Sequence, residues 1–164
     1  MNKLLILDLD QTLIYSKSID QRPTLSDNMF RFRVAGKQYI SKFRPGLREF
    51  LQKVERKGWE IGIWTAATRP YMNTIKRHIF GSRRIKIKLC RDDCKVLKCF
   101  RRKFYAKPLA SVVGEKRNII LVDDSKLVCK YNPQMSIKIK PWLGKRKHDT
   151  ELERVYNRLC QYWD

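Results

Sequence analysis

Residues 3–10, KLLILDLD, decide the fold class of this chain. The run of apolar residues is short and does not alternate with polar ones. This pattern predicts a strand over residues 3–8 that is buried on both faces, as in a parallel sheet. Asp8 and Asp10 stand where that strand ends. Open α/β sheets bind ligands beyond the carboxyl ends of their strands, so these two carboxylates are the first candidates for a functional site.

Two further apolar runs repeat this arrangement. Residues 59–64, WEIGIW, end at Thr65, and residues 118–122, NIILV, end at Asp123 and Asp124. Each run predicts a buried strand that delivers polar side chains at its carboxyl end.

The segments around these runs carry helical signals. From Leu47, apolar residues recur with the spacing of one helix face, and Gly58 ends the pattern. A proline opens a predicted helix over residues 70–80. Thr150 and Glu153 have the spacing of a capping box at the start of a last helix. Strands alternating with helices predict an α/β fold with a Rossmann-like, mainly parallel central sheet flanked by helices.

Shorter β segments accompany this framework. Residues 29–34 and 38–43 flank a turn and predict a β-hairpin with one apolar face, preceded by a loop. Residues 83–105 predict a small β-rich insertion, and residues 135–139 a fourth strand of the sheet. Nothing between Thr65 and the end of that insertion is long enough for a large cap domain.

Length and composition favour one domain over residues 1–164, because 43% of the 164 residues are hydrophobic and can form a core. The chain contains no apolar run of about 18 residues, so no membrane span is expected. The first apolar run is also shorter than the roughly 7–15 residues of a signal-peptide core. We therefore expect a nuclear or cytoplasmic protein, and we favour a monomer.

The charge is strongly unbalanced, with 37 Lys and Arg against 16 Asp and Glu, a net charge of +21. Residues 76–107 alone contain 13 basic and 2 acidic residues. Such an excess favours an acidic partner, either nucleic acid, a phosphorylated protein or an anionic membrane surface, over simple solubility. The basic run at residues 145–147 fits a nuclear signal or a solvated loop.

The five cysteines include a cluster formed by Cys90, Cys94 and Cys99. Their spacing raises the question of a zinc site. There is no C-x2-C pair, however, and the chain has 2 histidines, so reduced thiols are the favoured interpretation.

The strand ends together predict a metal site. Asp8, Asp10, Asp123 and Asp124 would meet at one edge of the sheet, with Thr65 beside them. Four carboxylates in one crevice repel each other unless a cation is present. Hard oxygen ligands at this density suit Mg²⁺, which also shares phosphate oxygens.

The first two aspartates also belong to a recognisable motif. Residues 8–13, DLDQTL, match the D-x-D-x-T signature of the haloacid dehalogenase (HAD) superfamily. The companion motifs follow in order: Arg44-Pro45-Gly46, Trp64-Thr65-Ala66-Ala67 with Tyr71, Cys90-Arg91-Asp92-Asp93-Cys94, Lys107, Val122-Asp123-Asp124-Ser125 and Asp149-Thr150-Glu151-Leu152. Over nearly its whole length the chain resembles the FCP/SCP-like, or NLI-interacting-factor-like, phosphatases of the RNA polymerase II C-terminal domain.

This resemblance implies a role for each matching catalytic residue. Asp8 resembles the nucleophile that becomes an aspartyl-phosphate, and Asp10 the general acid and base, whose backbone carbonyl also binds the metal. Thr65 resembles a hydroxyl donor to the phosphate, and Lys107 the lysine that neutralises both nucleophile and phosphate. The implied metal ligands are Asp8, Asp10, Asp123 and Asp124, and the implied cofactor is Mg²⁺.

The resemblance also implies a substrate and its contacts. The expected substrate is phosphoserine or phosphothreonine in an acidic protein segment. Phe32 and Val34 match positions that shape an apolar pocket, although ordinary hairpin packing explains them as well. Tyr71 and Arg91 match positions on the substrate side.

The chain departs from the family pattern in two places. Pro108 follows the lysine where the family has aspartate, and Gln11 stands where glutamate is common. Two other functions stay open. One is a phosphatase for nucleic-acid 3′ ends, whose substrate the positive charge would attract. The other is a basic module that binds nucleic acid or phosphoprotein and whose catalytic site is idle.

Overall fold

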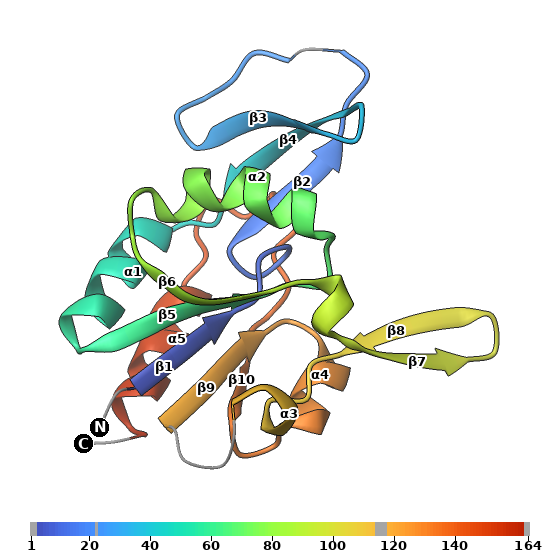
Figure 1. Ribbon diagram of the computed structural model, residues 1–164. Coiled ribbons are helices and arrows are strands. Elements are labelled where there is room, and N and C mark those ends of the chain that lie inside the picture. The colour runs from blue at the N-terminus through green and yellow to red at the C-terminus, as the bar shows by residue number, and fades with distance from the viewer. Residues whose placement is uncertain (1–2, 22, 114–117, 163–164) are drawn as a thin grey trace.

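The centre of the molecule is a five-stranded parallel sheet (Figure 1). The computed structural model describes residues 3–21, 23–113 and 118–162. The strand order is β10-β9-β1-β5-β6, and every neighbouring pair is parallel. The bounds are β1 Lys3–Leu7, β5 Trp59–Trp64, β6 Ile85–Leu89, β9 Asn118–Asp123 and β10 Ser136–Lys138. The mainly parallel α/β architecture expected from the sequence is confirmed.

Helices cover both faces of this sheet (Figure 1). They are α1 Leu47–Arg56, α2 Arg69–Phe80, α3 Ala110–Val113, α4 Lys126–Tyr131 and α5 Glu151–Cys160. Alternate residues of β1 enter two apolar clusters. Leu5 and Leu7 pack with residues of α1, α2 and α5, whereas Leu4 and Ile6 pack with Val128 of α4. Burying a leucine of this kind is worth about 1.5–3 kcal/mol, so β1 is held from both sides.

A second, antiparallel sheet follows β1 in the chain. It consists of β2 Ile14–Ser18, β3 Met29–Val34 and β4 Lys37–Phe43 in the order β2-β4-β3. The predicted hairpin is confirmed as β3 and β4, but the expected loop before it contains β2. The pattern of β2 is weak, because Ile14 is its one fully buried residue. Its long-range pairing with β4 is what orders it.

The predicted insertion is smaller than residues 83–105. Strand β6, which falls within that range, pairs with β5 and forms an edge of the central sheet. Its alternation of isoleucine and lysine resembles a surface hairpin because an edge strand is half-exposed. The part that projects from the body is the antiparallel hairpin of β7 Lys95–Cys99 and β8 Arg102–Ala106 (Figure 1). A 3₁₀ turn, η1 Arg91–Asp93, connects β6 to it.

The predicted capping box of the last helix is wrong. The side chain of Thr150 makes no capping hydrogen bond, and Asp149 Oδ1 instead accepts one from the Glu151 N–H at 3.2 Å. Asp149 also accepts hydrogen bonds from two of the three guanidinium nitrogens of the buried Arg44, Nε at 2.7 Å and Nη2 at 3.0 Å. An ionised residue that caps the helix and pairs with arginine satisfies more donors than threonine could. Trp163, expected to continue the helix pattern, lies outside the described residues.

Candidate active site

The carboxyl ends of the central strands bring the predicted site residues together. Strand β1 lies between β5 and β9, with Leu7 opposite Ile63 and Val122, so the next residues of all three strands are neighbours. The Asp8 N–H donates to the Val122 carbonyl at 3.0 Å. A cavity of about 430 Å³ is lined by, among others, Asp8, Asp10, Thr65, Lys107, Asp123 and Asp124.

Three of the four aspartates form a candidate cation site. Asp8, Asp123 and Asp124 each offer a carboxylate oxygen, and these oxygens lie within 4.8 Å of one another. Burial, and then the negative charge of Asp8, raises the pKa of Asp123 to about 7 and that of Asp124 to about 6. A raised pKa means that the ionised form of each carboxylate is disfavoured. A hard divalent cation bound between them would stabilise that ionised form. The residues present therefore fit the Mg²⁺ that the sequence predicts.

Lys107 lies between two of these carboxylates. Its ammonium Nζ is 2.7 Å from Asp8 Oδ1 and 2.5 Å from Asp123 Oδ2, and the lysine is 2% exposed. Burial alone would lower the pKa of Lys107, but the two carboxylates outweigh burial and raise it. The lysine therefore stays charged inside the protein and partly neutralises the acidic cluster.

Asn132 holds the backbone on either side of Pro108. Its amide Nδ2 donates to the Lys107 carbonyl at 2.8 Å, and its Oδ1 accepts the Leu109 N–H at 3.1 Å. Asn132 is buried and comes from the end of α4. This clasp positions the lysine segment although the family's aspartate is absent. Sequence reasoning missed Asn132, because a lone asparagine carries no pattern.

Thr12 was quoted as part of the signature but was not predicted as a site residue. Its hydroxyl donates to Asp8 Oδ2 at 3.1 Å and lies 3.5 Å from Asp124 Oδ1. With Lys107 on the other oxygen, both oxygens of the Asp8 carboxylate are held. Thr65 is also buried in the cavity wall, where its hydroxyl oxygen accepts the Ala67 N–H at 3.1 Å.

The side chain of Asp10 has different neighbours from the other three aspartates. Its Oδ1 accepts a hydrogen bond from the Tyr71 hydroxyl at 2.7 Å, and that hydroxyl lies 2.7 Å from Ser16 Oγ. Burial raises the pKa of Asp10 to about 6, the Tyr71 hydrogen bond opposes the rise, and Asp8 adds to it. In the part of the chain that the structure describes, the Asp10 carboxylate does not join the candidate cation site.

The predicted substrate-side residues border a second hollow beside the site. Val34, Tyr71 and Arg91 line this hollow of about 560 Å³ together with Asp10. Phe32 does not line it. The Phe32 ring is buried, 5.1 Å from the Tyr39 ring and 5.3 Å from the Tyr71 ring. Both tyrosines line the hollow, so Phe32 would shape it only through them.

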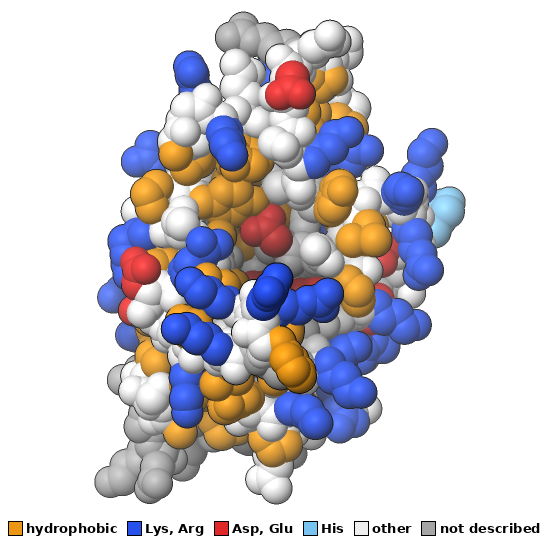
Figure 2. Space-filling view, turned by 90° about the vertical axis from the view of Figure 1, so that its right-hand side faces the viewer, with side chains coloured by type: hydrophobic (Ala, Val, Ile, Leu, Met, Phe, Trp, Pro, Cys, Tyr) orange, Lys and Arg blue, Asp and Glu red, His pale blue; other side chains and the backbone are white. Residues whose placement is uncertain are grey.

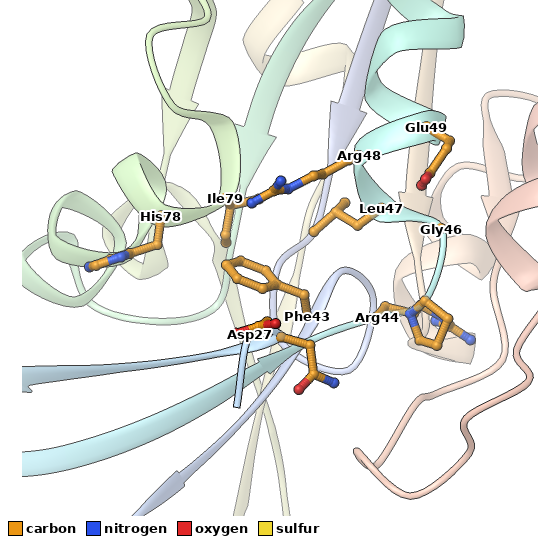
Figure 3. A pocket seen from close by; sticks show the side chains of 11 residues that line it. Asp27, Phe43, Arg44, Gly46, Leu47, Arg48, Glu49, His78 and Ile79 are labelled. Atoms are coloured by element: carbon orange, nitrogen blue, oxygen red, sulfur yellow. The ribbon is translucent and has the colours of Figure 1, made fainter. Parts of the chain in front are cut away.

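A separate cavity, which Asp27 helps to line, contains none of the four aspartates of the candidate site (Figure 3). It has a volume of about 440 Å³ and is bordered by the end of β4, the start of α1 and the end of α2. Phe43, Leu47 and Ile79 contribute apolar surface there, and His78 stacks on the buried Phe30 with ring centroids 4.3 Å apart. None of the predicted site residues lines this cavity.

The cysteine cluster borders the site. Cys90 is buried with its Sγ 3.8 Å from Asp92 Oδ2, and Cys94 Sγ lies 3.5 Å from the Cys90 carbonyl. The Cys94 thiol is also 4.0 Å from the carbonyl of Thr65. Burial raises the pKa of both thiols. The Cys99 side chain lies outside the described part, so reduced thiols in place of a zinc site stay a prediction from the sequence.

A parallel sheet flanked by helices, with an acidic cluster at the carboxyl ends of its strands, is the fold of the HAD class of phosphohydrolases. The profile of the family described as NLI interacting factor-like phosphatase matches residues 3–162, and the chain belongs to that family. Its members and structural neighbours are phosphoric monoester hydrolases. No described helix is both long enough and apolar enough to cross a membrane.

Relatives of known sequence agree with this assignment. The CTD phosphatase-like protein 355R of Invertebrate iridescent virus 3 is 33% identical over 96% of this chain and 95% of its own length. CTD small phosphatase-like protein 2 of Dictyostelium discoideum is 30% identical over 90% of this chain, which spans 25% of that protein. The human CTD small phosphatase-like protein is 27% identical over 92% of this chain, which spans 52% of it.

Solved structures share the fold. The fission yeast RNA polymerase II CTD phosphatase Fcp1, bound to beryllium fluoride, matches with a TM-score of 0.68 and 24% identity. That match covers 97% of this chain and 50% of the other. A second structure of Fcp1 matches with a TM-score of 0.61 and 23% identity, covering 97% and 48% of the two chains.

Proposed function

We propose that this protein is a Mg²⁺-dependent phosphoprotein phosphatase that removes phosphate from phosphoserine or phosphothreonine through an aspartyl-phosphate on Asp8. The observation that carries the proposal is the pair of hydrogen bonds on the Asp8 carboxylate, from Lys107 and from Thr12, inside a cavity shared with Asp10 and Thr65. A fixed carboxylate beside a buried cation is well placed to attack phosphorus.

Asp8 and Asp10 would divide the reaction into two steps. In the first, an Asp8 oxygen bonds to phosphorus, the bond from phosphorus to the serine oxygen breaks, and Asp10 gives that oxygen its proton. In the second, Asp10 takes a proton from water, the water oxygen bonds to phosphorus, and the bond to Asp8 breaks. A pKa of Asp10 raised to about 6 by burial suits a group that must both give and accept a proton.

The remaining groups would stabilise charge. Lys107 is a buried cation next to the attacking carboxylate and would offset the charge on the phosphoryl oxygens. The Thr65 hydroxyl would donate to one of those oxygens. Mg²⁺, held by Asp8, Asp124 and Asp123 with the Asp10 carbonyl, would supply electrostatic stabilisation of the phosphate when bound.

The open site favours a macromolecular substrate. No cap domain covers the cavity in the described chain, and the hollow bordered by Val34, Tyr71 and Arg91 continues from it past Asp10. Lys and Arg side chains gather around the acidic hollow (Figure 2), which would attract an acidic phosphorylated segment. Two relatives are named CTD small phosphatase-like proteins, and the structural neighbour Fcp1 is named an RNA polymerase II CTD phosphatase. We propose a phosphorylated segment of that kind as the substrate class.

Phosphate release from two substrates tests the proposal. With Mg²⁺, we expect turnover of a phosphoserine peptide, no turnover of a 3′-phosphorylated oligonucleotide, and loss of turnover in EDTA. Asp8→Asn abolishes turnover with unchanged circular dichroism, whereas Asp20→Asn, at an exposed carboxylate, does not. Stopping the reaction in acid traps a phosphorylated protein, seen as added mass on the peptide that contains Asp8.

The opposite results would select the alternatives. Turnover of the oligonucleotide alone would identify a nucleic-acid 3′-phosphatase, the second candidate, which the positive charge favours. Failure to hydrolyse either substrate, with salt-sensitive binding to nucleic acid or phosphoprotein, would identify a binding module with an idle site.

A further inference from the structure

The β7–β8 hairpin carries a concentration of positive charge, and Lys103 is its one cation that lines the active-site cavity in the described chain. Residues 95–106 contain five cations and no Asp or Glu, and these cations are Lys95, Lys98, Arg101, Arg102 and Lys103. Within the described part of the chain, none of the five forms an ion pair with a carboxylate. The hairpin projects from the body (Figure 1), and Figure 2 looks onto the face from which it projects.

Two features of the hairpin are unfavourable for an isolated protein. The register places Lys98 directly opposite Lys103, and like charges at this cross-strand distance repel each other. Phe100 at the tip has a φ of 51°, a conformation that is costly for a bulky residue, and its side chain is fully exposed at 102%. Residues that break local rules in this way often serve binding, because a ligand can offset their cost.

The side chains at the tip combine aromatic faces with cations. Phe100, Arg101, Arg102 and Phe104 together line one hollow of the hairpin surface. Phe104 is 39% exposed, so both aromatic rings are accessible to solvent. Aromatic side chains next to lysine and arginine are the recognition chemistry of single-stranded nucleic acid, in which bases stack on rings while cations hold phosphates.

The hairpin also leads into the active-site cavity. Lys103, Phe104 and Tyr105 line the cavity that contains Asp8. Arg91 connects the hairpin to the cavity wall. Its guanidinium lies 5.2 Å from the Tyr105 ring centroid, and its Nε donates to the Ala66 carbonyl at 2.8 Å. Cations and rings therefore follow one another along the hairpin from its tip to the site.

We propose that the β7–β8 hairpin is a docking site for single-stranded nucleic acid, with a base stacked at Phe100 and Phe104 and phosphates held by the hairpin cations. A five-residue strand spans about 16 Å, which matches four to five stacked nucleotides at about 3.4 Å each. A membrane-inserting hairpin would gather apolar residues at its tip. Here three consecutive cations, residues 101–103, separate the rings of Phe100 at the tip and Phe104 in β8.

Fluorescence anisotropy with a labelled twelve-nucleotide oligo(U), in EDTA and at several salt concentrations, tests this proposal without any phosphatase turnover. Phe100→Ala weakens binding about 5- to 150-fold, the range for one stacked base. Phe100→Leu weakens it similarly, because leucine keeps apolar volume but has no π face, whereas Phe100→Trp binds at least as tightly as the parent. Arg101→Ala with Arg102→Ala lowers the salt slope by about 1.4, or about 0.7 per lost phosphate contact.

A matched control removes the same charge elsewhere. Arg56→Ala with Lys57→Ala alters two exposed cations at the end of α1, on the opposite side of the molecule from the hairpin (Figure 1), and leaves the salt slope within error of the parent. The proposal is overturned if Phe100→Leu and Phe100→Ala bind oligo(U) like the parent. It is also overturned if the protein prefers phosphatidylcholine–phosphatidylserine vesicles to oligo(U) and Phe100→Leu retains that preference, which would indicate a membrane surface.

Discussion

Lys107 and Asp8 form a buried ion pair with 2.7 Å between Nζ and Oδ1, although 99 residues separate them in the chain. The same ammonium also holds Asp123. One lysine therefore connects the residue proposed as nucleophile with the acidic pair at the end of β9.

Replacing this lysine tests both its catalytic and its structural contribution. Lys107→Met should lower kcat on p-nitrophenyl phosphate at least about 100-fold, because a preorganised charge next to the phosphoryl group is lost. It should also lower the free energy of unfolding by about 3–5 kcal/mol in EDTA, since two buried carboxylates lose their cation. Lys130→Met, at an exposed lysine of α4, is the control. A Lys107→Met enzyme with near-normal kcat would exclude the lysine from catalysis.

The Arg44–Asp149 pair connects the signature loop to the last helix. Arg44 donates to the carbonyls of Gln11 and Thr12 at 3.3 Å and 3.0 Å, besides its two contacts with Asp149. Arg44→Lys keeps the charge but cannot form this fork, and we expect it to destabilise the protein by about 2–4 kcal/mol in urea unfolding. Arg56→Lys, on the surface of α1, should change stability by less than about 0.5 kcal/mol. Equal midpoints for the two variants would contradict the structural role of Arg44.

The acidic cluster predicts an unusual pH dependence for the metal-free protein. The pKa values of Asp123 and Asp124 are raised to about 7 and about 6, against about 3.9 in an unfolded chain. Between pH 4 and pH 7 the folded state therefore binds more protons than the unfolded state, so these groups lower stability as pH rises. Thermal unfolding in EDTA should show this loss, and Mg²⁺ at pH 8 should reverse it. Asp124→Asn should lose less stability across the same range; an identical pH profile would refute the assignment.

Tyr71 should tune the proton transfer by Asp10. Its hydrogen bond opposes the rise in the Asp10 pKa, so Tyr71→Phe raises that pKa further. Asp10 then stays protonated to higher pH. The alkaline limb of the pH profile of kcat/KM for a phosphoserine peptide therefore moves to higher pH. p-Nitrophenyl phosphate has a leaving group that needs no proton, so its alkaline limb should move less. Equal displacement of both profiles would show that Tyr71 does not act through Asp10.

The framework of the candidate site could be predicted because its signals are local. A polar site residue stands directly at the end of each of the three buried apolar runs. Parallel strands bring those ends to one edge of the sheet. Asp8, Thr65 and Asp123 therefore meet as expected from the sequence alone. Their individual roles in catalysis stay predictions until the variants are measured.

The parts that sequence reasoning missed depend on long-range partners. Strand β2 has little pattern of its own and is defined by pairing with β4. Asn132 clasps the segment around Pro108 from 25 residues away, and the capping role of Asp149 depends on where Arg44 lies. Strand β6 was misassigned because an edge strand and a surface hairpin share the same alternation. No local window contains these relationships.

The place of β1 in the sheet has a consequence for biosynthesis. Lys3 lies opposite both Trp59 and Asn118, so β1 is translated well before β9, the strand that completes its pairing. Until β9 has emerged, Asp8 lacks Asp123 and Asp124, and one edge of a very apolar strand is uncovered. Between the translation of β1 and that of β9, the nascent chain thus lacks the complete acidic cluster and is prone to aggregate. Stalled chains that end before residue 118 should bind chaperones and hydrolyse nothing.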